Sequence, residues 1–115
     1  MPRISRKKVL EIIARYWPDA DPDEIIKILD GYGLERYEQG RNRVQIAILK
    51  LCAGQIERLP ELVKMAKTDY RDVLAYAEYP EEMKIGFVGM NKLSPEEALS
   101  VRRRDREQYL SWLGG

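Results

Sequence analysis

A chain of 115 residues with 44% hydrophobic and 34% charged side chains is long enough to form one hydrophobic core and too apolar to be disordered. Its 20 basic and 19 acidic side chains give a net charge of +1, which is too balanced to indicate a polyanionic partner. The single cysteine excludes an intramolecular disulfide, and no apolar run reaches the length of a membrane span. We therefore expect one soluble, cytoplasmic domain over residues 1–115, without membrane contact.

The first part of the chain has the spacing of two amphipathic helices. Ser5 is a suitable N-cap for a first helix, whose apolar stripe ends at Pro18. A second, short helix begins at residues 21–24, where an N-cap aspartate, a first-turn proline and two acidic residues follow one another. Gly31 and Gly33 then allow the backbone conformations that end this helix.

The middle of the chain predicts three further helices. Apolar residues keep a helical spacing over residues 34–54, which indicates one long helix with Gly40 inside it. A second helix is expected from near Arg58 to residue 67, because Pro60 fits only in a first turn. A third begins after Asp69, as an N-cap, and ends before Pro80.

The last part of the chain contains one irregular segment and one clear helix. Residues 84–93 carry two glycines and no helical period, so we expect a connection there that covers the core with Phe87 and Met90. A final helix is expected from Ser94 to Gly114, because a serine cap, a first-turn proline and a third-position glutamate occur together at its start.

These elements predict an all-α protein, a compact bundle of five to seven helices packed as antiparallel hairpins. The segments TDYRDVLAYAEYPEE and LSPEEALSVRRRDREQYLSWL resemble small, uncharacterised bacterial all-helical proteins, with a likeness that extends over about residues 34–113. The resemblance implies helical hairpins with an armadillo-like packing. It implies no activity.

The segment SVRRRDREQYLSW contains four arginines within five positions. Placed on a helix, Arg102 and Arg106 fall within the apolar face, whereas Arg103 and Arg104 point elsewhere. We therefore expect the first pair to lie along the core and to reach carboxylates on another helix, with the following acids considered first: Asp69, Asp72 and Glu78. The alternative is that the same two arginines line a cleft and bind an anion or a partner's carboxylate.

Charge is distributed unevenly along the first half of the chain. Residues 3–15 contain five bases and one acid, whereas residues 19–38 contain seven acids and two bases. Either the two helices complement each other within one chain, or one copy's first helix meets another copy's second helix in a dimer. A helix-turn-helix reader built on Arg41, Arg43 and Gln45 is the less favoured interpretation, because the acidic residues before it would repel phosphate.

Catalysis has little support in the sequence. The chain has no histidine, and so it lacks the usual general base, metal ligand and triad partner. Without a histidine, Cys52 is expected to be a small buried side chain and not a nucleophile. The acids of residues 69–82 match no calcium loop or helical di-metal pattern, and we expect them to be solvated.

Tyr76 and Tyr79 lie off the apolar face of their predicted helix, so at least one of them is expected to be exposed to a partner. We therefore expect a non-enzymatic protein-interaction or self-associating helical module, with a homodimer or another protein as partner and no metal or cofactor. The alternative is an anion-binding or nucleic-acid-binding protein that uses arginine-rich helix surfaces. The candidate binding residues are Arg102, Arg106, Tyr76, Tyr79, Asp69 and Asp72.

Overall fold

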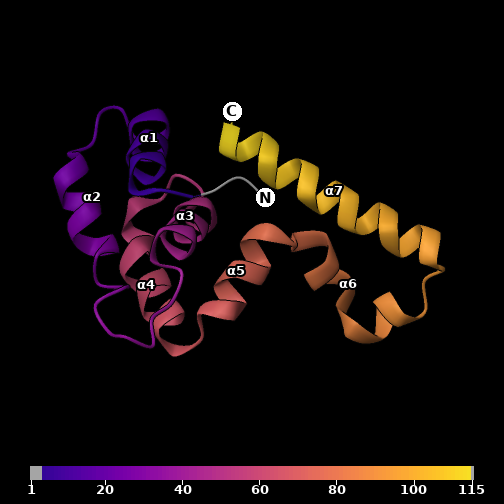
Figure 1. The fold of residues 1–115 in the computed structure, drawn as a ribbon. Helices are drawn as coiled ribbons and strands as arrows, with labels where there is room; N and C mark the ends of the chain where they lie inside the picture. The colour runs from indigo at the N-terminus through magenta and orange to yellow at the C-terminus, as the bar shows by residue number, and fades with distance from the viewer. Residues whose placement is uncertain (1–3, 115) are drawn as a thin grey trace. The chain divides into compact units, whose positions relative to one another are not determined.

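The computed structural model describes residues 4–114 (Figure 1). Within this range the chain has seven α-helices, one 3-10 turn and no strand, which confirms the all-α prediction. The chain divides into two compact units, Met1–Leu74 and Ala75–Gly115. The single domain expected from chain length stays a prediction. Among the described residues, no helix has the length and apolar character needed to cross a membrane.

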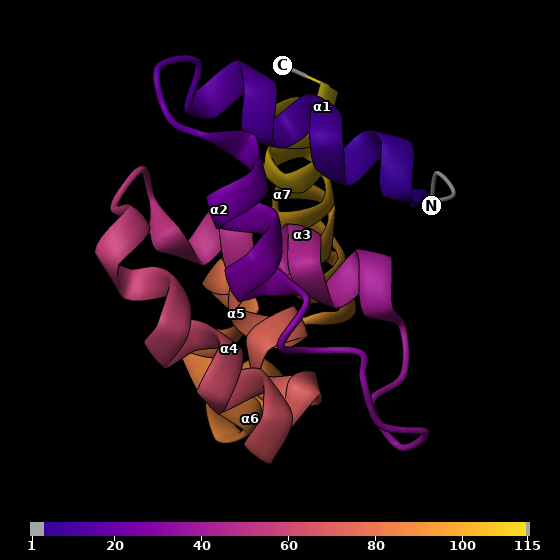
Figure 2. The same cartoon turned by 90° about the vertical axis from the view of Figure 1, so that its left-hand side faces the viewer.

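The first unit is built around a central helix, α3 (Arg41–Cys52), whose residues are buried on nearly every side. α3 packs against α1 (Arg6–Tyr16) and against α4 (Leu59–Thr68), while α2 (Pro22–Leu29) packs against α1 and α4 (Figure 2). A 3-10 turn, η1 (Ile56–Arg58), precedes α4, so the predicted start of this helix near residue 58 is confirmed.

Three predicted helix starts are formed by short-range hydrogen bonds. The hydroxyl of Ser5 accepts a hydrogen bond from the backbone amide of Lys8, and the carboxylate of Asp21 accepts one from the backbone amide of Asp23. Ser94 and Glu97 each accept the other's backbone amide at 3.1 Å, which is a complete capping box at the start of α7 (Pro95–Gly114).

The long helix predicted over residues 34–54 is wrong. Gly40 adopts a left-handed conformation with φ of 62°, and α3 begins only after it. Leu34 and Tyr37 are 72% and 68% exposed, so the apolar spacing that extended the prediction toward the N-terminus does not belong to a core face. The residues before Gly40 form the loop that joins α2 to α3.

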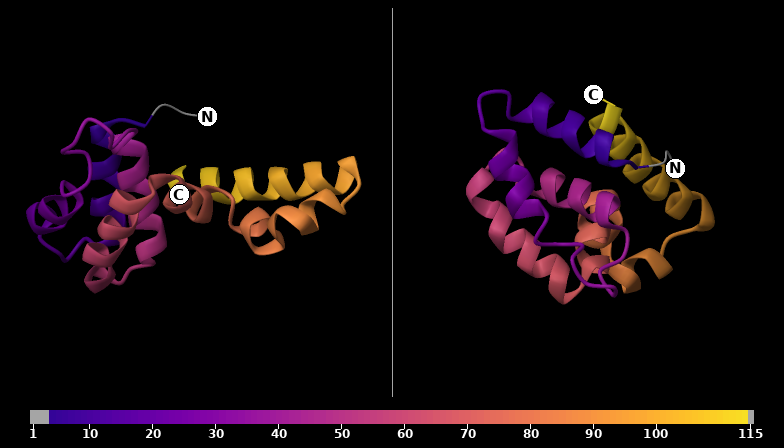
Figure 3. Two further views of the ribbon diagram at one scale, coloured as in Figure 1. Left: turned by 90° about the horizontal axis from the view of Figure 1, so that it is seen from below. Right: turned by 60° about the vertical axis from the view of Figure 1, so that its left-hand side comes forward.

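α5 (Tyr70–Glu78) contains the boundary between the units, and the second unit continues with α6 (Pro80–Asn91). α6 and α7 run side by side in opposite directions as a helical hairpin (Figure 3). The core of this hairpin consists of the following residues: Ile85, Met90, Leu93, Ala98 and Val101.

The connection predicted over residues 84–93 is also wrong, because nearly all of this segment is helical. Gly86 interrupts α6 with φ of 82° and ψ of 169°, a backbone conformation that is costly for any residue other than glycine. Met90 is buried as expected, but Phe87 is 83% exposed. Gly86 therefore marks a kink within a helix, and the segment is not a linker.

Candidate functional site

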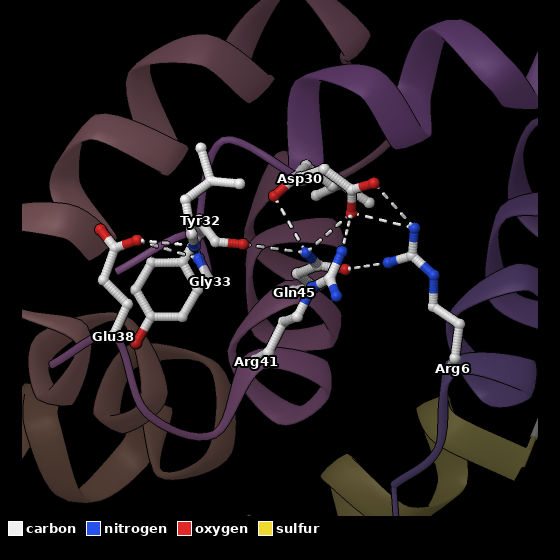
Figure 4. Close-up of polar contacts among 9 residues, drawn as sticks. Arg6, Asp30, Tyr32, Gly33, Glu38, Arg41 and Gln45 are labelled. Carbon is white, nitrogen blue, oxygen red and sulfur yellow. Dashed lines mark hydrogen bonds and ion pairs between the residues drawn. The ribbon is translucent and has the colours of Figure 1, made fainter. Parts of the chain in front are cut away.

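In the first unit, the most buried polar side chain is Gln45, which is fully enclosed on α3 (Figure 4). Its Oε1 accepts a hydrogen bond from Arg6 Nη1 at 2.8 Å. Its Nε2 donates to the carbonyl oxygens of Leu29 at 3.0 Å and Tyr32 at 3.2 Å. The amide thus occupies the C-terminal end of α2 and fixes where the chain leaves that helix.

Asp30 lies beside Gln45 and binds two arginines from different elements (Figure 4). Arg6 Nη2 is 2.9 Å and Arg41 Nη2 is 2.8 Å from the same carboxylate oxygen, Oδ1. Burial raises the pKa of the Asp30 carboxyl, but the hydrogen bonds from Arg41, Gln45 and Arg6 outweigh it and leave that pKa below its usual value. One base of the first helix, Arg6, therefore pairs with one acid of residues 19–38 within the same chain, and the dimer alternative stays a prediction.

This arrangement argues against the helix-turn-helix interpretation. A base-reading side chain has to be free to reach into a groove of DNA. Gln45 is 0% exposed, and Arg41 is held by Asp30. Two of the three proposed reading residues are therefore committed to the protein's own structure.

Glu38 fixes the loop between α2 and α3, and its side chain is only 1% exposed. Its Oε1 accepts the three consecutive backbone amides of residues 33–35, at 3.0, 3.0 and 3.2 Å. Its Oε2 accepts Lys67 Nζ at 2.8 Å, and the same ammonium donates to the Gly31 carbonyl at 2.8 Å. Burial raises the pKa of Glu38, yet the hydrogen bonds from Lys67 and the loop amides bring that pKa below its usual value.

A polar cavity of about 280 Å³ lies next to this loop. Burial and the charge of Glu38 raise the pKa of Tyr32, one of its lining residues, to about 12. The cavity's cations and acids pair with one another, since Lys67 binds Glu38 and Arg71 binds Asp69. The complete lining is Tyr32, Tyr37, Glu38, Ala66, Lys67, Thr68, Asp69, Tyr70 and Arg71.

Of the acids on and before α5, Asp69 has a local partner and Asp72 faces solvent, but Glu78 is 1% exposed, so the expectation that the acids of residues 69–82 are solvated is wrong for Glu78. Asp69 Oδ1 accepts the backbone amide of Arg71 at 3.0 Å and its guanidinium Nε at 3.1 Å, and Arg71 lowers the pKa of Asp69. Asp72 is exposed. Among residues 4–114, no group of three acidic, cysteine or histidine side chains has a geometry that could hold a metal ion.

In the second unit, the orientation predicted for the arginines of α7 is wrong. Arg102 and Arg106 are both exposed, and the polar side chain that faces inward is Asp105, which is 1% exposed. Leu99 belongs to the apolar pattern that placed these two arginines on the inner face, but it is 56% exposed and lies outside the buried stripe. That stripe consists of Ala98, Val101, Asp105, Tyr109 and Leu113.

Asp105 caps the neighbouring helix across the hairpin. Its Oδ1 accepts the backbone amide of Glu81 at 2.9 Å, and its Oδ2 accepts that of Glu82 at 3.0 Å. These amides belong to the first turn of α6, where backbone donors have no partner within the helix. Sequence reasoning missed this role, although an aspartate four residues from both Val101 and Tyr109 was a visible signal.

Two of the four arginines of α7, Arg102 and Arg104, pair with acids from the start of α6. Arg104 binds Glu81 through two parallel hydrogen bonds, from Nε at 3.0 Å and Nη2 at 2.7 Å, and this contact lowers the pKa of Glu81. Arg102 Nε lies 3.6 Å from Glu82 Oε1. The expected pairing of Arg102 with the acids considered first, Asp69, Asp72 and Glu78, is therefore replaced by a pairing inside the hairpin.

An open cavity of about 560 Å³ lies on one face of the same hairpin, and we call it the α6 groove. Its α6 residues recur at helical spacing on both sides of the Gly86 kink, and Arg102 reaches it from α7. Phe87 in its lining is 83% exposed, and Tyr79 is 39% exposed. The lining consists of Tyr79, Glu82, Met83, Gly86, Phe87, Met90, Asn91 and Arg102.

The remaining candidate side chains behave as the sequence indicates. Tyr76 and Tyr79 are 47% and 39% exposed, so the expectation that at least one is accessible is confirmed. Cys52 is fully buried, and its thiol donates to the carbonyl of Gln55 at 2.6 Å. Burial raises the pKa of the Cys52 thiol, which keeps it protonated at neutral pH.

Comparison of the chain with models of known protein families, with curated protein sequences and with solved structures found no match. The function is therefore inferred from this chain's own side chains.

Proposed function

We propose that this chain is a protein-interaction module that binds its partner through the α6 groove. The observation that carries the proposal is Phe87, a large apolar side chain that is 83% exposed at the edge of an apolar hollow. Exposed apolar surface that is contiguous with a groove marks interaction sites on proteins. Moving one phenylalanine side chain from water into an interface contributes about 2–3 kcal/mol.

The residues around Phe87 support the same surface. Tyr79, an amphipathic aromatic side chain that is 39% exposed, lines the groove. Tyrosine and phenylalanine are enriched at interfaces because they bury much area with little loss of side-chain entropy. Glu82 and Arg102 supply a polar rim of the kind that surrounds binding sites.

The alternative proposal, an anion-binding or nucleic-acid-binding protein, has less support. Such a protein needs several guanidinium groups that are free to meet phosphate. Of the four arginines in this part of the helix, Arg104 is held by Glu81 and Arg102 lies close to Glu82, so two of the guanidinium groups already have a carboxylate beside them. The proposed location is the cytoplasm, on the grounds given by the sequence.

A site-specific photo-crosslinker tests the proposal. p-Benzoylphenylalanine is placed at position 87 in one variant and at position 107 in another, and both are irradiated in the cells from which the gene comes. Glu107 is an exposed α7 residue outside the groove, so it is the matched control. We expect a discrete protein adduct from position 87 only. The absence of any adduct from position 87 above the level at position 107 would refute the proposal.

A further inference from the structure

We infer that α6 is a two-state element, in which the kink at Gly86 opens the α6 groove and a straight helix closes it. The switch itself stands on the geometry of α6. Its role, which is to regulate access to Phe87, rests on the proposed function. The physical basis is that α6 carries two overlapping apolar patterns, and the kinked helix uses only one of them.

The pattern in use joins Ile85 and Met90. Both side chains pack against the core of the hairpin, beside Ala98 and Val101 of α7. Residues five apart on a regular helix point about 140° away from each other, so an unbroken α6 would turn one of the two side chains away from that core. The non-helical backbone at Gly86, between the two, removes this conflict.

The unused pattern joins Met83, Phe87 and Met90. These residues follow one another at intervals of four and three, so on a straight helix they would share a face about 60° wide. In the kinked helix Phe87 is 83% exposed, although Met90 of the same pattern is buried. A straight α6 that keeps Met90 in the core therefore turns Phe87 toward α7 and exposes Ile85 in its place.

The two glycines of α6 lie where the patterns diverge. Gly86 is needed for its backbone conformation and not for space, since an added Cβ atom would meet no described atom within 4 Å. Gly89 is needed for space, because an added Cβ atom would lie 2.7 Å from Ile85 Cγ2. A regular helix has neither requirement and favours alanine over glycine at both positions.

The two forms exchange one large apolar side chain for another, Ile85 inside when α6 is kinked and Phe87 inside when it is straight. Their free energies therefore differ little, which is the condition for a switch. A partner that contacts exposed Phe87 binds only the kinked form, so its apparent affinity falls in proportion to the kinked fraction.

Fluorine NMR tests the switch without any partner. Phe87 is the only phenylalanine in the chain, so 4-fluorophenylalanine labels this position alone. A soluble gadolinium complex relaxes an exposed fluorine faster than a covered one. We expect an exposed major form in the wild type, with saturation transfer to a covered minor form populated at about 0.1–10%.

Glycine replacements shift this population in opposite directions. Gly86→Ala and Gly89→Ala should each raise the ratio of covered to exposed fluorine at least about fivefold, because alanine disfavours the kink and favours a helix. D-alanine at position 86, introduced by peptide ligation, should remove the minor form, since the mirror-image residue prefers positive φ.

Gly54→Ala is the matched control. Gly54 has a φ of 81°, against 82° at Gly86, and its added Cβ atom also meets no described atom within 4 Å. Gly54 lies in a turn outside α6, so this variant carries the same backbone strain and should leave the fluorine spectrum unchanged. A single exposed form in the wild type, with no covered fluorine in either α6 variant, overturns the switch. Unfolding of both α6 variants beside a wild type with one form overturns it as well.

Crosslinking from position 87 separates the switch from the proposed function. Gly86→Ala should lower the yield of the protein adduct at least about threefold. An unchanged yield, in a variant whose fluorine is covered, overturns the regulatory role and leaves the proposed function standing. A switch seen by NMR without any adduct from position 87 overturns the proposed function and leaves the switch.

Discussion

Asp105→Ala removes the carboxylate that caps α6 from α7. Two backbone amides, those of Glu81 and Glu82, then lose an acceptor at 2.9 and 3.0 Å. A hydrogen bond to a charged group contributes about 1.5–3 kcal/mol, and the lower value applies here because the freed amides of a first helical turn can be hydrated. We therefore expect a loss of about 3 kcal/mol in the free energy of unfolding.

Urea unfolding followed by circular dichroism measures this loss. With a slope of about 1.5 kcal/mol per molar urea, the midpoint should fall by about 2 M. Amide hydrogen exchange by NMR adds a local readout, since the amides of Glu81 and Glu82 should become the least protected part of α6. Asp105→Asn should lie between the wild type and alanine, because one side-chain oxygen remains as an acceptor.

Glu107→Ala is the control for this measurement, because Glu107 is an exposed acid on the same helix. Its expected effect is within about 0.5 kcal/mol. If Asp105→Ala and Glu107→Ala had the same midpoint and the two α6 amides stayed protected, the capping role of Asp105 would be wrong. Arg102→Ala and Arg106→Ala should behave like the control, contrary to the sequence-based expectation, because both arginines are exposed.

Three further experiments address the first unit. Gln45→Glu should lower the free energy of unfolding in urea by about 2–4 kcal/mol, because a carboxylate would then face the Leu29 and Tyr32 carbonyls. A loss below about 1 kcal/mol would contradict the hydrogen-bond assignment. The pKa of Glu38 is lowered in the folded chain, so its contribution is fully present above its unfolded pKa of about 4.3 and is lost as pH falls through the folded value. Melting temperatures measured from pH 6 to pH 3 should therefore fall less steeply in Glu38→Gln than in the wild type. The buried Cys52 thiol should react with Ellman's reagent only as the chain unfolds, and a rate equal to that of a small free thiol would contradict its burial.

The sequence by itself determined where most helices begin. Ser5, Asp21 and Ser94 cap helices through contacts with amides two or three residues away. Such contacts depend on neighbours in the sequence and need no information about the rest of the fold. The burial of Cys52 followed similarly, from its place between apolar neighbours in a helical spacing.

Only the tertiary structure decided which polar side chains face inward. Asp105 accepts hydrogen bonds from backbone amides 24 and 23 residues away in the sequence. Gln45 donates to carbonyls 16 and 13 residues away and accepts from the guanidinium of Arg6, 39 residues away. The apolar pattern of α7 placed Arg102 on the buried face of the helix, because the sequence does not show which of Leu99 and Val101 is buried. Which of them is buried depends on where α6 packs, and an apolar residue gains free energy from burial only where another element covers it.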